Sequence, residues 1–181
     1  MNIRKPTDYT TMFAALDALM AAQLPQMELY REIGRVVSGR AEKGAAVAAS
    51  EYLQMTCPDV EGFSPRNLRR MRAFYAAYEE SPEIMRLAMN LGWTQNVAIL
   101  ERCGSSEERA WYIRAVLRFG WKKAKLLESI KTQAWRNSSL DEQVVSCYTG
   151  EKEITQESES DEEDTLCMPW QYLPQPHGRV R

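Results

Sequence analysis

The chain has 181 residues, and 44% of them are hydrophobic, which suits one compact domain with a core, or a domain with a tail. No apolar stretch approaches the roughly 20 residues that a membrane-spanning helix needs, and the first residues, MNIRKPTDY, lack the apolar run of a signal peptide. We therefore expect a cytoplasmic protein.

The net charge of −2 hides an uneven distribution. Residues 1–136 contain 20 Lys and Arg against 15 Asp and Glu, a balance of +5, whereas residues 137–181 contain 3 against 10, a balance of −7. A basic body with an acidic tail is common in proteins that contact polyanions or regulate that contact. We expect a helical domain over 1–136 and a tail over 137–181.

Metal and cofactor sites are not expected. The four cysteines, Cys57, Cys103, Cys147 and Cys167, form no C-x-x-C pair, and His177 is the only histidine. We expect Cys57 and Cys103 to be buried, reduced thiols.

The first two predicted helices follow from helical spacing of apolar residues. Thr7 or Asp8 can cap the first, and Pro25 interrupts or restarts it. The second should end near Gly39, because glycine often follows the last helical residue.

Capping signals divide the middle of the chain. An alanine-rich stretch, 43–55, predicts a third helix, and residues 56–63, with Pro58 and Gly62, predict a turn. Ser64 followed by proline is a strong start signal for a helix that runs to about residue 80.

Four further helices are expected. Ser81 followed by proline begins a short helix through residue 91, and Thr94 is a candidate cap for the next, which ends at 103–104. Ser105 with Glu108 forms a capping-box pattern for a helix that stops near Gly120, and residues 122–135 form the last. Since no long alternating run appears, the predicted class is all-α.

The tail contains two kinds of sequence. The run EKEITQESESDEED is too charged to bury a core, so it is predicted to be disordered. Beyond it, residues 168–176 contain Trp170, Tyr172 and Leu173 among prolines, which indicates a short segment that docks onto a partner.

The helix that begins at Ser64 has two different faces. At 100° per residue its core side carries Leu68, Met71, Phe74, Tyr75 and Tyr78. The opposite side carries Arg66, Arg69 and Arg70, then Ala73 and Ala77, with Arg72 at the flank.

Arginines on such a helix can pair with phosphates or guanine edges, and small alanines let the helix approach a surface. With the alanine-rich helix before it, this helix has the outline of a helix-turn-helix unit. The alternative is the exposed charged face of an ordinary bundle.

A second basic cluster contains Lys122, Lys123 and Lys125. Cations at the start of a helix oppose its dipole, so an external anion would explain them, as would a chance surface cluster.

Catalytic patterns are missing from the sequence. With one histidine there is no histidine-based triad, no common glycine-rich phosphate loop occurs, and the dense carboxylates lie in the tail. We therefore expect a protein that is not an enzyme.

Several segments resemble the N-terminal domain of the YhcG family. They are LYREIGRVV, DVEGFSPRNLRRMRAFYAAY, LGWTQNVAILERC and ERAWYIRAVLRFGWKKAKLLESI, within residues 29–130. The resemblance implies a helical, winged-helix-like DNA-binding part, usually joined to a PD-(D/E)XK nuclease domain. Gln95 stands where the family usually has histidine, and the chain ends where the nuclease would begin, so nuclease activity is not expected.

Two functions remain open from the sequence. The first is an accessory or regulatory DNA-binding protein, of a mobile element or defence system, that uses the arginines and lysines above. The second is a protein-interaction module that docks a partner nuclease or itself through the helical body and the tail. In the first case, the acidic tail could also cover the basic face.

Overall fold

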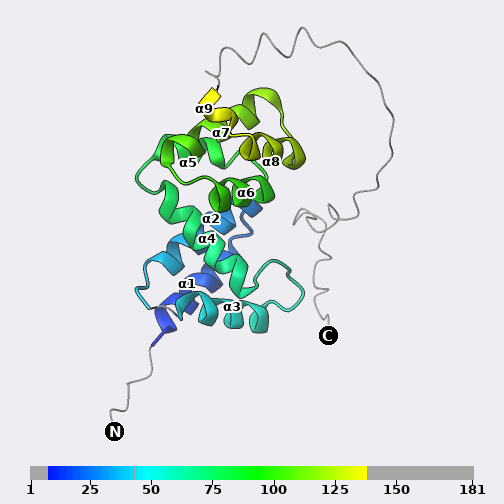
Figure 1. Ribbon diagram of the computed structural model, residues 1–181. Coiled ribbons are helices and arrows are strands. Elements are labelled where there is room, and N and C mark those ends of the chain that lie inside the picture. Colours follow the sequence, from blue (N-terminus) through cyan, green and yellow to red (C-terminus); the bar gives the residue numbers. More distant parts are fainter. Residues whose placement is uncertain (1–7, 43, 138–181) are drawn as a thin grey trace.

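The computed structural model describes residues 8–42 and 44–137, and within these ranges the chain forms nine helices and no strand (Figure 1). The predicted all-α class is confirmed. The helices are α1 (Thr10–Ala21), α2 (Gln26–Ser38), α3 (Ala45–Thr56), α4 (Pro65–Tyr78), α5 (Pro82–Ala88), α6 (Trp93–Arg102), α7 (Ser106–Phe119), α8 (Lys123–Lys131) and α9 (Ala134–Asn137).

Two predicted helix starts are built by local capping. The hydroxyl of Ser64 accepts a hydrogen bond from the backbone N–H of Asn67 at 3.3 Å, and Ser105 accepts one from Glu108 at 3.1 Å. Each bond satisfies a backbone donor that the first turn of a helix leaves free. The predicted stop at Gly120 is also confirmed, since this glycine adopts a left-handed conformation with φ of 63°.

Several helix boundaries differ from the prediction. Helix α5 ends at Ala88 and not at residue 91, and the cap position of α1 is Tyr9 and not Asp8. Thr94 is not a cap, because Oε1 of Gln95 accepts the backbone N–H of Gly92 at 3.0 Å and α6 begins at Trp93. The predicted helix over 122–135 is divided into α8 and α9 at Gln133, whose φ of 53° breaks the helical path. This break allows Trp135 to pack back against the core.

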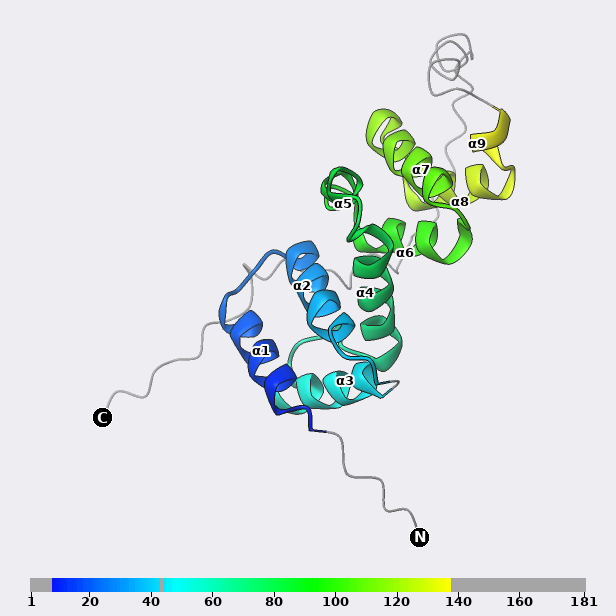
Figure 2. The ribbon, with the colours of Figure 1, turned by 90° about the vertical axis from the view of Figure 1, so that its left-hand side faces the viewer.

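Helix α4 is the central element of the fold. It packs against α2 and α3 and also contacts α5 and α6. Helix α4 thus joins the half of the molecule that contains α1–α3 to the half that contains α5–α9 (Figures 1 and 2). Gly34 makes the crossing of α2 and α4 close. A Cβ atom at this position would lie only 2.2 Å from the carbonyl oxygen of Met71.

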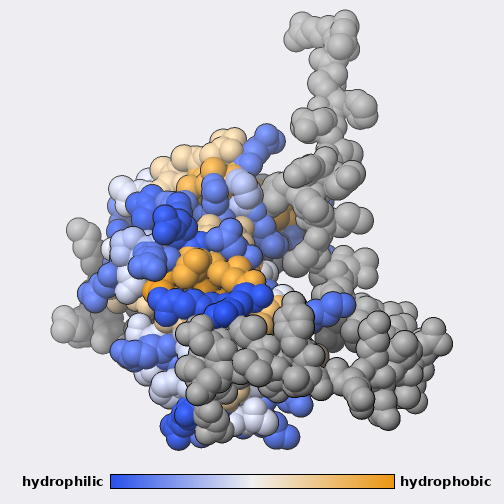
Figure 3. Space-filling view, turned by 90° about the horizontal axis from the view of Figure 1, so that it is seen from above, coloured by the Kyte–Doolittle hydropathy of each residue, from blue (hydrophilic) through white to orange (hydrophobic). Residues whose placement is uncertain are grey.

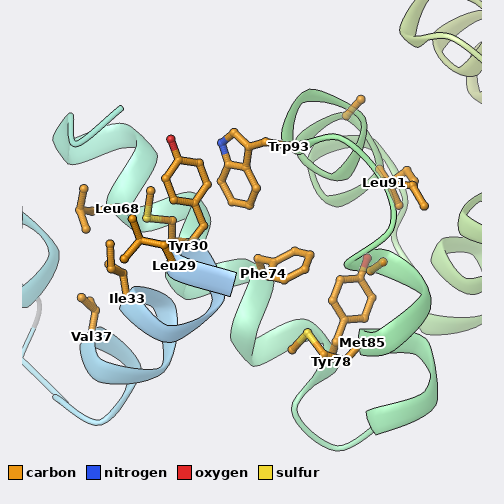
Figure 4. Close-up of a cluster of buried hydrophobic side chains, with 14 of the residues drawn as sticks. Leu29, Tyr30, Ile33, Val37, Leu68, Phe74, Tyr78, Met85, Leu91 and Trp93 are labelled. Carbon is orange, nitrogen blue, oxygen red and sulfur yellow. The ribbon is translucent and has the colours of Figure 1, made fainter. Parts of the chain in front are cut away.

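Aromatic side chains hold this centre together. The ring of Trp93 meets Tyr30 edge-on at 5.0 Å between centroids and Phe74 at 5.8 Å (Figure 4). Phe74 in turn packs edge-on against Tyr78 at 5.3 Å. Such edge-to-face pairs add to the stabilisation that burial provides, so α2, α4 and α6 are fixed relative to one another.

One aromatic residue predicted to lie in the core is less buried than expected. Tyr75 is half-buried and packs at the edge of the core. Cys103 is buried as predicted, whereas Cys57 is only half-buried.

The face of the molecule seen in Figure 3 is mostly hydrophilic but not uniform. Figure 3 looks down on the end of the molecule that carries α5, α7, α8 and α9, where hydrophobic atoms gather in a patch bordered by hydrophilic side chains. Leu117 of α7 belongs to this end and is 39% exposed. Among the described helices, none has the length and apolar composition needed to cross a membrane.

Candidate nucleic-acid interface

The first turns of α4 present arginine side chains to solvent. Arg66 is 76% exposed, and Arg69 is also exposed and makes no ion pair within residues 8–42 and 44–137. Because Leu68 and Met71 are fully buried, α4 can turn only this side outward. The predicted orientation of these two arginines therefore agrees with the structure.

Small side chains continue the exposed stripe along α4. Ala73 is exposed as expected, but the next exposed alanine is Ala76, while Ala77 is half-buried. The expected role of Ala77 at the surface is therefore wrong, because this residue packs beside the core. The stripe still offers a low surface on which an extended polyanion could approach the helix backbone.

Arg70 is held by an acidic residue from another helix. Its Nε and Nη2 atoms donate to Oε1 of Glu101 at 2.8 and 2.6 Å, and its side chain is only 28% exposed. Arg66 lies 3.8 Å from the same oxygen. Glu101 therefore orients two of the arginines and partly neutralises them. Nothing in the local sequence around α4 indicates this residue.

Arg72 faces a different part of the molecule. Its Nη2 donates to the backbone carbonyl of Arg40 at 3.2 Å, and the residue is half-buried. This contact ties α4 to the connection between α2 and α3. Arg72 therefore lies apart from Arg66 and Arg69, although the sequence pattern placed all three in the same predicted nucleic-acid-binding group.

The lysine cluster lies at the start of α8. Lys122, Lys123 and Lys125 are all exposed, and Lys125 pairs with Glu128 at 3.0 Å. Helix α6 contacts both α4, which carries the arginines, and α8, which the lysines begin (Figure 1).

Gln95 links α6 to the lysine segment. While its Oε1 caps α6, its Nε2 donates to the backbone carbonyl of Trp121 at 2.7 Å. The position at which the resemblance expects histidine therefore has a structural role in this chain. It fixes the residue directly before Lys122.

Two of the segments that carry the family resemblance, around Asn67 and around Trp93, also meet in space. The indole N–H of Trp93 donates to Oδ1 of Asn67 at 2.9 Å, while Nδ2 of Asn67 donates to the carbonyl of Gly62 at 2.6 Å. Gly62 has φ of 95° and lies against the hydroxyl of Tyr30, so a side chain would not fit there. These motif residues thus position the start of α4.

The remaining predicted site is the docking segment of the tail. Its residues, Trp170, Tyr172 and Leu173, lie outside the described residues. Among the residues that the structure describes, no group of three or more His, Cys, Asp or Glu side chains could hold a metal ion.

The described residues define a class: an all-α domain built around a central helix that exposes arginines at its N-terminal turns. A family model described as the DUF1016 N-terminal domain matches residues 14–137. The chain therefore belongs to this family, which is the YhcG-like N-terminal family. The comparisons with curated proteins and with solved structures find no match.

Proposed function

We propose that this protein binds nucleic acid, with duplex DNA as the expected form, through the exposed face of α4. The observation that carries this proposal is the position of Arg66 and Arg69 at the first turns of α4, exposed and beside a third arginine oriented by Glu101. The dipole of α4 contributes partial positive charge at its N-terminus, but its backbone N–H groups contribute little, because Pro65 has none and Ser64 already accepts the N–H of Asn67. Arginines at that end add charges that can pair with phosphates.

The neighbouring elements support an extended contact. The exposed Ala73 and Ala76 continue the face along α4, and the exposed Lys122 and Lys123 lie at the start of α8, which contacts the same helix, α6, as α4 does. A backbone tracked by several cations is bound mainly through counterion release. The proposal thus predicts binding that weakens steeply as salt rises.

In this proposal α4 is the recognition helix of a unit related to the helix-turn-helix. Its support is α3, which contacts α4 and is joined to it by residues 57–64. That connection is longer than the roughly 3–4-residue turn of the common motif. A β-wing is not part of the proposal, because the described residues contain no strand.

We further propose that the protein acts as an accessory or regulatory factor in the cytoplasm and catalyses no reaction itself. This part rests on the sequence, in which the usual catalytic patterns are missing. Incubation of the purified protein and Mg²⁺ with supercoiled, linear and single-stranded DNA tests it. Cleavage that copurifies with the protein through several columns would contradict it.

The binding test is a fluorescence-anisotropy titration of the full chain against labelled duplex DNA, single-stranded DNA and RNA at several salt concentrations. The Arg66→Ala/Arg69→Ala variant should bind duplex DNA more weakly. Its slope of log affinity against log salt should be shallower by about 2, roughly 0.9 for each lost phosphate contact.

The matched control is Arg35→Ala/Arg114→Ala, which removes two exposed arginines from α2 and α7. If the control loses as much affinity as the test variant, the total charge and not the α4 face governs binding. Failure of the wild-type chain to bind any of the three polymers contradicts the proposal as a whole.

A further inference from the structure

A groove lies at the opposite end of α4 from the exposed arginines. Residues of α2, the C-terminal end of α4 and the segment around α5 enclose a space of about 620 Å³, open to solvent. This volume is in the range that accommodates several large side chains. The groove is therefore a candidate docking surface that the α4 face does not use.

The floor of the groove is apolar and adaptable. Met27, Met85 and Met89 line it together with Tyr75 and Tyr78. Methionine side chains adjust their shape to a partner and make favourable contacts with aromatic rings. Grooves that contain aromatic residues are also a common binding surface for proline-rich segments.

The rim of the groove is acidic. Glu28 and Glu79 are exposed, and neither makes an ion pair within the described part of the chain. Arg31 also lines the groove, but its charge is paired with Glu32 at 2.7 Å. Arg86 thus offers one positive charge against two free carboxylates, so a partner with basic groups would be favoured.

The chain itself contains a segment of matching composition. Residues 168–181, MPWQYLPQPHGRVR, combine Trp170, Tyr172 and Leu173 with prolines and two arginines, Arg179 and Arg181, and contain no acidic residue. All ten acidic residues of 137–181 lie before residue 165. The tail therefore has an acidic part and, after it, an aromatic and basic part.

The length of the chain allows this segment to reach the groove. Residue 137 ends α9, which lies in the same half of the molecule as α5 (Figures 1 and 2). The roughly 30 residues between 137 and 168 span about 30 Å even as a random coil, and more if their charges repel. Docking within one molecule then gains from a high effective concentration.

We propose that residues 168–181 dock into the groove between α2, α4 and α5 of the same molecule, with Trp170 and Tyr172 on the methionine floor and Arg179 and Arg181 at the glutamate rim. This inference does not depend on nucleic-acid binding, because the groove and the exposed arginines lie at opposite ends of α4. Each can fail without the other.

The test is methyl NMR of the full chain with labelled methionines. An aromatic ring in contact with a methyl group shifts its signal, so Trp170→Ala and Tyr172→Ala should move the signals of Met27 and Met89. Met55 on α3, 74% exposed, is the internal reference and should not move. All substitutions lie in the tail, so the folded domain itself is unchanged.

A charge variant tests the rim. Arg179→Glu/Arg181→Glu should move the same signals as Trp170→Ala, because it turns attraction to Glu28 and Glu79 into repulsion. Lys152→Glu, in the acidic part of the tail, is the matched control and should leave them in place. Groove signals that are identical in all variants overturn the proposal. So do shifts that appear only as the protein concentration rises, because these would place the segment on a second copy.

Discussion

The indole N–H of Trp93, at the start of α6, donates a hydrogen bond to the side chain of Asn67 in the first turn of α4. The same asparagine donates to the carbonyl of Gly62 at 2.6 Å. The side chain of Asn67 thus joins the loop before α4 to the start of α6. We conclude that the start of the arginine-bearing helix is held by tertiary contacts as well as by its own cap.

Trp93→Phe should destabilise the protein by about 1–2 kcal/mol, because it leaves the half-buried Asn67 oxygen without its donor. Chemical denaturation measures this loss. Trp121→Phe is the control, since the indole of Trp121 makes no hydrogen bond in the described part of the chain. Equal losses in the two variants would mean that ring volume, and not the hydrogen bond, matters.

Gly34→Ala should destabilise the protein by about 1–3 kcal/mol, as overpacking typically does. The added methyl group would meet the Met71 carbonyl at 2.2 Å, and backbone atoms cannot yield as a flexible side chain can. Gly39→Ala, near the end of the same helix, meets nothing closer than 3.5 Å and should stay near wild type. Thermal unfolding of both variants is the measurement. An unchanged melting temperature for Gly34→Ala would contradict the close crossing of α2 and α4.

Glu101→Gln should increase the affinity for duplex DNA about fivefold, which corresponds to about 1 kcal/mol for a surface ion pair. The substitution removes the carboxylate that competes with phosphate for Arg66 and Arg70. Anisotropy titration at low salt is the measurement, and Glu51→Gln on α3 is the control of equal charge change. The same gain in affinity for both variants would show that the change in net charge, and not the release of Arg66 and Arg70, strengthens binding.

Cys103 should make stability fall at alkaline pH. Burial, reinforced by the nearby Glu108 carboxylate, raises the pKa of this thiol from its usual 9.0 to about 12. Below pH 9 the thiol is neutral in both the folded and the unfolded states. Between pH 9 and about 12 only the unfolded state ionises, so stability is lost as pH rises.

Melting temperatures at pH 7–10 test this prediction. In Cys103→Ala the decline above pH 9 should be shallower than in wild type. Val116→Ala, which removes buried volume but no ionisable group, controls for lost packing and should keep the wild-type decline. Parallel curves for all three proteins would show that Cys103 does not titrate in this way.

The all-α class and many helix boundaries could be predicted from the sequence alone. The caps at Ser64 and Ser105 and the stop at Gly120 involve residues within a few positions of one another, so local sequence patterns can predict them. The division of the last helix at Gln133 could not be predicted in this way. It accompanies the packing of Trp135 against the core, where α9 contacts α7 and α8.

The environment of the α4 arginines, in contrast, depends on contacts between segments that are far apart in the sequence. Arg70 and Glu101 are 31 positions apart, and Arg72 meets the carbonyl of Arg40 across 32 positions. No spacing rule connects such residues, because their contacts depend on how helices cross. Those crossings are set by the close approach at Gly34 and by the aromatic packing around Trp93. Helical periodicity could show which side of α4 faces outward, but only the packed helices could decide which arginines are left exposed.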